Sequence, residues 1–123
     1  MKVDYESMSD HRINALVTSA VFGCEKWEYN DAEFYHCGID GGGYYSQTIL
    51  DYCNNPADAW PIIIENNISI NHEIARYKAS ALVYDVKYER GFNIFVFNSV
   101  IGDTSSRAAL RAAMIVFLMM SEQ

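Results

Sequence analysis

The sequence predicts an α+β fold in a single domain that spans residues 1–123. Apolar residues recur with helical spacing near both ends of the chain, while β-branched and aromatic residues dominate extended stretches between them. The length suits one hydrophobic core. We therefore expect one antiparallel sheet of about four to five strands, packed with an N-terminal helix, a short central helix and a C-terminal helix. The strand order does not follow from the sequence.

The first helix is predicted over residues 9–22. Its apolar positions recur at i, i+3, i+4, i+7 and i+8, and they are Ile13, Leu16, Val17, Ala20 and Val21. Ser9 is a favourable N-cap residue, and Gly23 provides a left-handed stop. Asn14 is a polar exception to this amphipathic pattern.

An aromatic hairpin is predicted over residues 26–37, KWEYNDAEFYHC, with its turn at Asn30 and Asp31. The glycine-rich stretch GIDGGGYYSQ follows as a loop, and the extended pattern resumes at QTILDY, residues 47–52. Backbone N–H groups of such a loop can bind a phosphate. No Lys-Ser/Thr pair follows it, however, so a flexible turn is the favoured interpretation.

The most individual segment is NNPADAWPIIIENNISI, residues 54–70. Asn55 can cap a short helix that has Pro56 at its first position and continues through residues 57 to about 65. Asp58 lies near the positive end of this helix. Pro61 lacks an N–H, so we expect the first turn to be tight or separate. A turn and the beginning of a strand at residues 68–70 should follow.

The main sheet is predicted over residues 76–98, where RYKASALVYDVKYE and FNIFVFN are joined at Arg90 and Gly91. Residues 94–97 are apolar on both faces, as expected of a central strand. The last helix is predicted over residues 107–120, and its apolar positions cover most of its circumference. It must be well buried, or buried partly against another subunit, and we expect a homo-oligomer.

The net charge of −7 opposes general attraction to phosphate backbones, so we expect no nucleic-acid partner. The charge is uneven, at −9 for residues 1–75 and +2 for residues 76–123, which allows a local positive surface in the C-terminal part. The apolar run of a membrane span or a secretory signal is missing. We therefore expect no membrane partner and a cytosolic location.

Cysteine and histidine residues do not predict a metal centre. Cys24, His36, Cys37, Cys53 and His72 lack the spacing of zinc ligands, and scattered cysteines usually fill the core, so no metal or other cofactor is expected. Three cysteines without a close pair favour free thiols. His36 and Cys37 are adjacent on a predicted strand, where neighbouring side chains point to opposite faces. Since no complete catalytic set can be named, we predict that the protein is not an enzyme.

The best candidate site lies at the beginning of the last helix, where Thr104, Ser105 and Ser106 precede Arg107 and Arg111. The two arginines are four residues apart and share a helical face. With the hydroxyls and free N–H groups at this end, they can hold a phosphate or a carboxylate. An ion pair with an acidic residue such as Asp58 or Asp103 is the equally weighted alternative.

Aromatic residues of the first half can stack on a nucleobase, although most of them are expected in the core or at an interface. The candidate ligand-binding residues are Arg107, Arg111, Thr104, Ser105, Trp60, Asn54, Asn55, Asp58, Tyr44 and Tyr45.

Three segments carry a family resemblance: MSDHRIN at residues 8–14, DYCNNPADAWPIIIENNISI at residues 51–70, and LRAAMIVFLMM at residues 110–120. Together they resemble the NinX-like family of small proteins from lambdoid phages and prophages. The resemblance implies an accessory phage protein in the bacterial cytoplasm, with no established enzymatic activity. Typical members carry Asn-Pro just ahead of the LRAAM stretch, where this chain has Ala108 and Ala109, and the glycine-rich segment is not part of the pattern.

Two functions fit such a protein. The first is sequestration of a small anionic, nucleotide-derived host signal, so that a bacterial defence system is not triggered, with Trp60 or Tyr45 stacking on the base and the arginines binding the phosphates. The second is a protein–protein interaction module whose acidic face covers a basic host or phage protein, for example in recombination or transcription. We favour the first on the sequence alone, because a cationic helix start in an acidic protein predicts an anion site.

Overall fold

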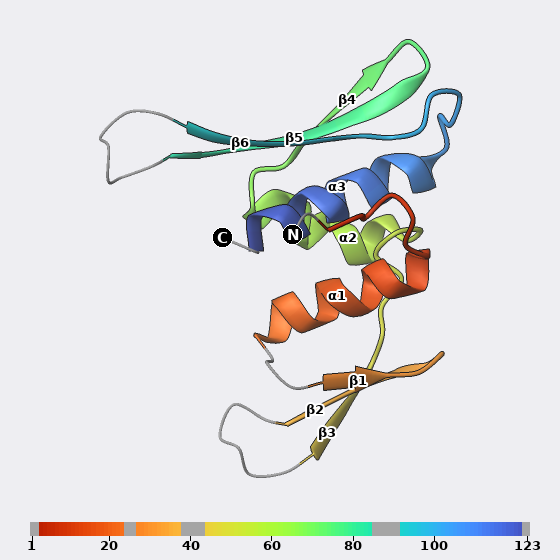
Figure 1. The fold of residues 1–123 in the computed structure, drawn as a ribbon, viewed down its shortest axis with the longest axis vertical. Helices are drawn as coiled ribbons and strands as arrows, with labels where there is room; N and C mark the ends of the chain where they lie inside the picture. The colour runs from red at the N-terminus through yellow and green to blue at the C-terminus, as the bar shows by residue number, and fades with distance from the viewer. Residues whose placement is uncertain (1–2, 24–26, 38–43, 85–91, 122–123) are drawn as a thin grey trace.

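The computed structural model describes residues 3–23, 27–37, 44–84 and 92–121, and these contain three helices and six strands (Figure 1). The elements, in chain order, are α1 (Asp10–Phe22), β1 (Trp27–Tyr29), β2 (Glu33–Cys37), β3 (Tyr44–Thr48), α2 (Pro56–Glu65), β4 (Ser69–Glu73), β5 (Arg76–Tyr84), β6 (Phe92–Asn98) and α3 (Ser106–Ser121).

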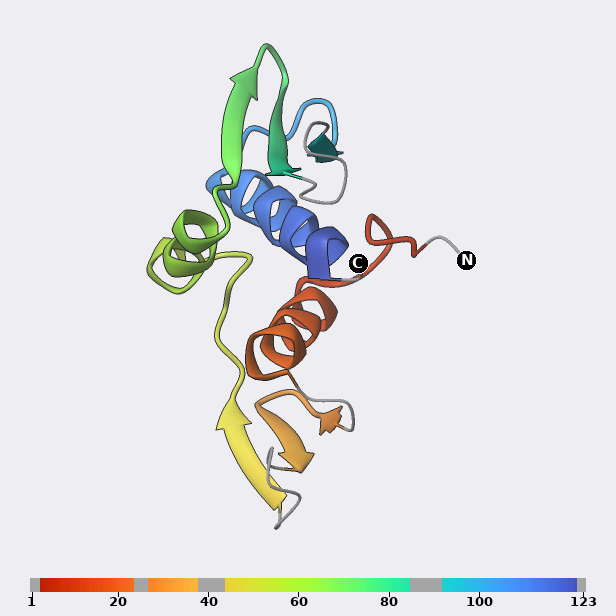
Figure 2. The same ribbon diagram turned by 90° about the vertical axis from the view of Figure 1, so that its left-hand side faces the viewer.

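The helices form the middle of the molecule, and two antiparallel sheets lie at opposite ends (Figures 1 and 2). One sheet has the order β1-β2-β3 and the other has the order β4-β5-β6. Helix α3 packs on β5 and β6 and also contacts α1 and α2. It is therefore the element around which the others assemble.

The α+β class and the three helices are confirmed, but the predicted single sheet of four to five strands is wrong. The described strands form two sheets of three, because the helices lie between the two groups of strands and prevent them from pairing. Strand β6, predicted to be central, lies at the edge of its sheet. Its Ile94 is 64% exposed opposite Leu82 of β5, which is 61% exposed, so this outer sheet face carries uncovered apolar side chains.

Helix α1 begins and ends as predicted. The Ser9 hydroxyl accepts a hydrogen bond from the Arg12 N–H at 3.1 Å. Gly23 has φ 66°, and its N–H donates to the Ser19 carbonyl at 2.9 Å. The left-handed conformation at this position favours glycine and ends the helix.

The polar exception in α1 has a structural role. Asn14 is buried, its side-chain oxygen accepts from the Cys53 N–H at 3.1 Å, and its Nδ2 donates to Asp51 Oδ1 at 3.1 Å. Both partners belong to the segment that leads into α2. Asn14 therefore fixes α1 to this segment while satisfying a buried backbone N–H.

Helix α2 has the predicted cap but not the predicted interruption. The Asn55 side chain accepts from the Ala57 N–H at 3.0 Å, and Pro56 occupies the first turn, where a missing N–H is harmless. Pro61 lies inside one continuous α-helix. A tight or separate first turn was therefore a wrong expectation.

The core is built around α3, whose residues 112–118 are all buried. They pack with Ile13 and Val17 of α1, Ile62 and Ile63 of α2, and small residues of β5. The apolar circumference of the last helix is thus covered within the chain, and the homo-oligomer stays a prediction. None of the helices in the described part of the chain combines the length and hydropathy that a membrane crossing requires.

Candidate functional site

Asp10, in the first turn of α1, joins the two arginines of α3. Arg107 donates from Nε and Nη2 to the two carboxylate oxygens of Asp10, at 2.5 and 2.7 Å, and Arg111 Nη1 lies 3.4 Å from Asp10 Oδ1. The hydrogen bond to Asp10 raises the pKa of Arg107. Asn54, just before α2, donates to Asp10 Oδ2 at 3.3 Å. We call these four residues the Asp10 cluster.

The cluster decides between the two interpretations of the arginine pair. An ion pair was the equally weighted alternative, and it is present, although its main acceptor is Asp10 and not Asp58 or Asp103. Asp103 Oδ2 lies 3.9 Å from Arg107 Nη1, which is a much weaker contact. The Asp10 carboxylate is also favoured by the positive end of α1. Both arginines therefore have a carboxylate partner within the chain.

Arg111 has a second role. Its Nη2 donates to the carbonyls of Met8, Tyr5 and Glu6, at 2.7, 3.0 and 3.2 Å. Its side chain is only 13% exposed, so these bonds satisfy a largely buried cation. Arg111 thereby holds the segment that precedes α1 against α3.

The Ser105 hydroxyl caps the start of α3. Ser105 accepts from the Ala108 N–H at 3.2 Å as an N-cap and donates to Asp103 Oδ1 at 2.6 Å. Its hydrogen bonds lower the pKa of Asp103. The Thr104 carbonyl accepts from the Tyr77 hydroxyl at 3.2 Å, which ties β5 to this loop.

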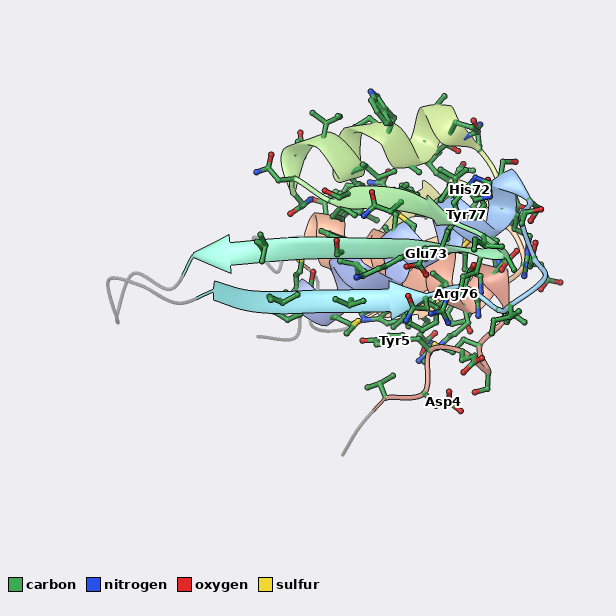
Figure 3. The ribbon with its side chains drawn as sticks, turned by 90° about the horizontal axis from the view of Figure 1, so that it is seen from above. Asp4, Tyr5, His72, Glu73, Arg76 and Tyr77 are labelled. Atoms are coloured by element: carbon green, nitrogen blue, oxygen red, sulfur yellow. The ribbon has the colours of Figure 1, made fainter. Side chains whose placement is uncertain are left out.

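Tyr77 is itself fixed at the beginning of β5. Its ring stacks on His72 of β4 with centroids 5.0 Å apart, next to the ion pair between Arg76 and Glu73 (Figure 3). The turn between β4 and β5 and the start of α3 are therefore held together by side chains.

A small hollow adjoins the arginines. Glu6, Phe97, Asp103, Arg107 and Arg111 are among the residues that line it, and its volume is about 50 Å³. Pockets for small organic ligands usually measure about 300–1,000 Å³. Glu6 and Asp103 also offset the charge of the arginines, so the hollow has neither the size nor the excess positive charge that a nucleotide requires.

The remaining polar residues of the central segment form hydrogen bonds in the stretch that precedes α2 and in its first turn. Asn54 donates to Asp51 Oδ1 at 3.0 Å in addition to Asp10, and the Asp58 carboxylate accepts from the Asp51 N–H at 3.1 Å. The Asp58 carboxylate thus satisfies one backbone N–H ahead of the helix, and the Asn55 cap satisfies one in its first turn. The structure thus brings Asn54 together with Arg107 and Arg111, whereas Asn55 and Asp58 act on the helix start.

Trp60 does not border the small hollow that adjoins the arginines. It is 59% exposed on α2, and it lines neither the small hollow nor the larger groove described below. In Figure 2, α2 and the segment of residues 3–8 lie on opposite sides of α3. The expectation that Trp60 stacks on a base held by Arg111 therefore has no geometric support.

The two tyrosines of the candidate site are on β3. Tyr45 is 45% exposed, and the side chain of Tyr44 lies outside the described residues, as does the glycine-rich segment 38–43. Within the described parts of the chain, no three His, Cys, Asp or Glu side chains group in a way that could hold a metal ion.

Sequence reasoning missed two participants. Asp10 lies 97 positions from Arg107, and an acidic residue in a first helical turn is ordinarily explained by the helix dipole. Arg12 of α1 lies with its guanidinium carbon 5.5 Å from the ring centroids of both Trp27 and Tyr29 on β1. Such a cation–π contact depends on tertiary packing, and its residues are not close in the sequence.

Residues 4–121 match the model of the family described as Bacteriophage P22, NinX. Neither a curated protein nor a solved structure matches the chain. The matched range contains every described helix and strand, including the three segments that carry the resemblance. Because the family model covers nearly the whole sequence, this chain belongs to the phage NinX family.

Proposed function

We propose that this phage protein is a non-enzymatic protein–protein interaction module of the bacterial cytoplasm, and that it binds its partner through the outer face of α2. The observation that carries the proposal is the exposure of Trp60 and Ile64, at 59% and 54%. They are four residues apart and share a helical face. Exposed tryptophan is rare on monomer surfaces and is enriched at the energetic centres of interfaces.

The outer face is apolar along its length. Ala57, Trp60, Pro61 and Ile64 are all exposed and follow the i, i+3, i+4, i+7 spacing of one helical stripe. A different stripe, formed by Ala59, Ile62 and Ile63, packs into the core. Since the inner stripe already secures α2, the outer one has no role in the fold that the described contacts account for. Figure 3 shows α2 at the edge of the molecule.

The charge around the stripe indicates the chemistry of the partner. Helix α2 contains Asp58 and Glu65 and no basic residue, and the sequence through residue 75 has a net charge of −9. A complementary surface would offer an apolar pocket for Trp60, bordered by lysine or arginine. We therefore propose a basic host or phage protein as the partner.

Sequestration of a nucleotide-derived anion is the competing function, and its premise has weakened. Sequestration requires that Arg107 and Arg111 have no carboxylate partner within the chain, but Asp10 pairs with both. Thermal melting with a nucleotide panel tests it directly, because a ligand at a hundred times its Kd stabilises the fold by about 2.7 kcal/mol. A reproducible shift with any nucleotide would favour sequestration over the interaction module.

The interaction itself is tested by capture from bacterial lysate at low salt, identification of the captured protein, and measurement of Kd with the purified partner. We expect Trp60→Ala to weaken binding about 30-fold, which corresponds to roughly 2 kcal/mol for an interface hot spot. Binding should also weaken at high salt, since the attraction between an acidic and a basic surface is screened.

Ile101→Ala is the matched control, because Ile101 is an apolar residue that is 72% exposed and lies outside α2. It should leave Kd unchanged. Equal effects of Trp60→Ala and Ile101→Ala would contradict the assignment of the interface to α2. If the protein forms a dimer that Trp60→Ala disrupts, the partner of the α2 face is a second copy of the chain and not a host or phage protein.

A further inference from the structure

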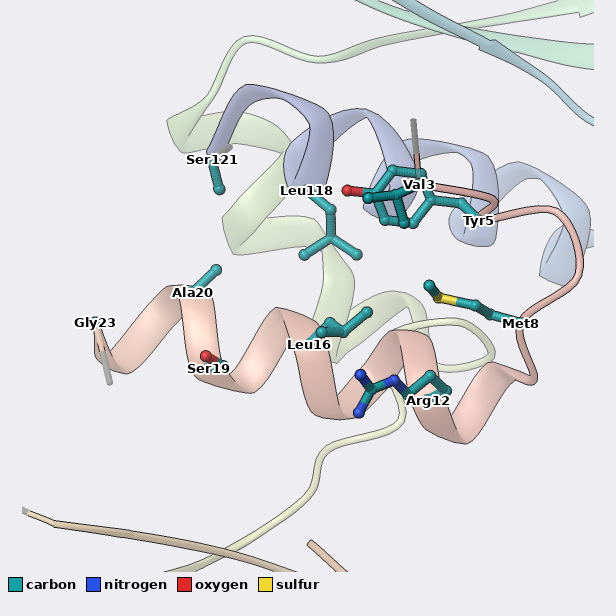
Figure 4. Close-up of a pocket in the computed structure, with 10 residues that line it drawn as sticks. All are labelled: Val3, Tyr5, Met8, Arg12, Leu16, Ser19, Ala20, Gly23, Leu118 and Ser121. Atoms are coloured by element: carbon teal, nitrogen blue, oxygen red, sulfur yellow. The ribbon is translucent and has the colours of Figure 1, made fainter. Parts of the chain in front are cut away.

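A groove of about 480 Å³ lies between α1, the end of α3 and the segment of residues 3–8 (Figure 4). Its apolar lining comes mainly from Tyr5, Met8, Leu16, Ala20 and Leu118. We propose that this groove binds a small amphipathic anion, with an apolar chain or ring between the helices and a single negatively charged head at the rim. This site is separate from the outer face of α2.

The apolar part of the groove has a simple origin. Leu16 and Ala20 are four residues apart on one face of α1, and Gly23 continues that face to the helix end. Leu16, Ala20 and Leu118 point toward one another across the gap between α1 and α3 (Figure 4). Small residues at Ala20 and Gly23 leave space that larger side chains would fill. The resulting volume falls within the usual range for ligand pockets, about 300–1,000 Å³.

The third wall is fixed by Arg111. The three carbonyls that accept from its Nη2 belong to Tyr5, Glu6 and Met8, and two of these residues line the groove. The groove is therefore bounded by a segment that three hydrogen bonds hold against a largely buried guanidinium. This arrangement gives the arginine a role in building a site, although the arginine itself does not line the groove.

The charge at the rim sets the kind of head group. Among the residues that the structure describes, Arg12 is the only charged one in the lining, and no described carboxylate forms an ion pair with it. Its aliphatic part lies along α1, and its guanidinium rests on the rings of Trp27 and Tyr29. A guanidinium held in this way can still donate hydrogen bonds to a carboxylate, phosphate or sulfonate.

Binding is tested with 8-anilinonaphthalene-1-sulfonate, whose fluorescence increases in apolar sites, and with dodecanoate as competitor. We expect displacement of the dye by dodecanoate at one site per chain. Decanoate, which has two fewer methylene groups, should compete about tenfold less well because each buried methylene contributes a similar increment. Dodecanoate should bind about threefold more tightly than dodecanol, as expected of an exposed ion pair.

Two variants separate the apolar and the charged parts. Arg12→Gln should abolish the preference for dodecanoate over dodecanol and keep the affinity for dodecanol. Ala20→Phe should fill the groove and abolish displacement, while Ile101→Phe, at an exposed position elsewhere, should bind as the wild type does. If Ala20→Phe does not fold, Leu16→Glu serves the same purpose, because it places a negative charge inside the groove.

Three results would overturn the proposal. The first is dye binding that is unaffected by both groove variants, and the second is equal competition by dodecyltrimethylammonium, which has the opposite charge. The third is a stable dimer in sedimentation experiments that Ala20→Phe dissociates, since a second copy would then occupy the groove. Trp60→Ala, which should weaken binding of the protein partner to α2, should leave all of these measurements unchanged. The two proposals can therefore fail independently.

Discussion

Replacement of Asp10 by asparagine should destabilise the fold, because Asp10 is the carboxylate that both arginines of α3 contact. Asp10→Asn keeps the size of the side chain and removes the charge that Arg107 and Arg111 share. The Asp10 side chain is 20% exposed, Arg111 is 13% exposed and Arg107 is 45% exposed. The cluster therefore lies between a surface ion pair and a buried one.

The expected magnitude follows from these exposures. An exposed ion pair contributes about 0–1 kcal/mol, and breaking a fully buried pair costs about 3–5 kcal/mol. Loss of a negative charge in the first turn of α1 adds a further destabilisation of about 0.3–1 kcal/mol, because that charge interacts favourably with the helix dipole. Because Arg107 is half exposed and Arg111 keeps its three carbonyl partners, we expect a total of about 2 kcal/mol. This corresponds to a decrease in Tm of roughly 8 °C.

Urea unfolding followed by circular dichroism measures the change, and the midpoint should fall by about 1 M. Glu65→Gln is the control, since Glu65 is exposed at the end of α2 and has no ion pair among the described residues. A double-mutant cycle with Arg107→Gln should give a coupling energy of about 1 kcal/mol. A loss no larger than that of Glu65→Gln, or a coupling energy near zero, would refute the reasoning.

Three further changes test other parts of the fold. Asn14→Ala should lower the free energy of unfolding by about 2 kcal/mol, because it leaves the buried Cys53 N–H without its acceptor; urea titration checks this. Gly23→Ala should cost about 1 kcal/mol, since φ is 66° there, and a normal Tm would contradict the helix end. Burial raises the pKa of the Cys53 thiol to about 12 from an ordinary value of 9.0, with a smaller contribution from Asp10. The folded state therefore keeps a proton that the unfolded state loses above pH 9. Between pH 9 and about 12, the free energy of unfolding should fall by about 1.4 kcal/mol per pH unit. Urea titrations over this range should show that extra slope in the wild type and not in Cys53→Ser.

Local features of the fold were predictable from the sequence. The N-cap at Ser9, the stop at Gly23 and the cap at Asn55 each use a hydrogen bond between residues two to four positions apart. The hairpin turn at Asn30 and Asp31 is equally local, with the Asn30 side chain accepting from the N–H groups of residues 32 and 33. Such bonds depend on residue type and spacing, and both can be read from the sequence.

The candidate site was only partly predictable. The two arginines were correctly placed on one face of the last helix, and an ion pair was weighed equally with an anion site. Its acceptor, Asp10, comes from α1, about a hundred positions earlier in the chain. Spacing arguments do not extend over such a separation, because it is the packing of α1 against α3 that brings the two charges together.

By itself, the sequence determined the α+β class, the approximate extents of the helices, the caps at Ser9, Gly23 and Asn55, and the family, because these depend on residue type and short-range spacing. Only the tertiary structure decided that the strands form two sheets, that Asp10 neutralises the arginines, that Trp60 faces outward and that a groove remains between α1 and α3. Each of these features depends on which surfaces meet when distant segments pack. Helical periodicity fixes the side chains that share a face, and the shared core then fixes the face that is buried.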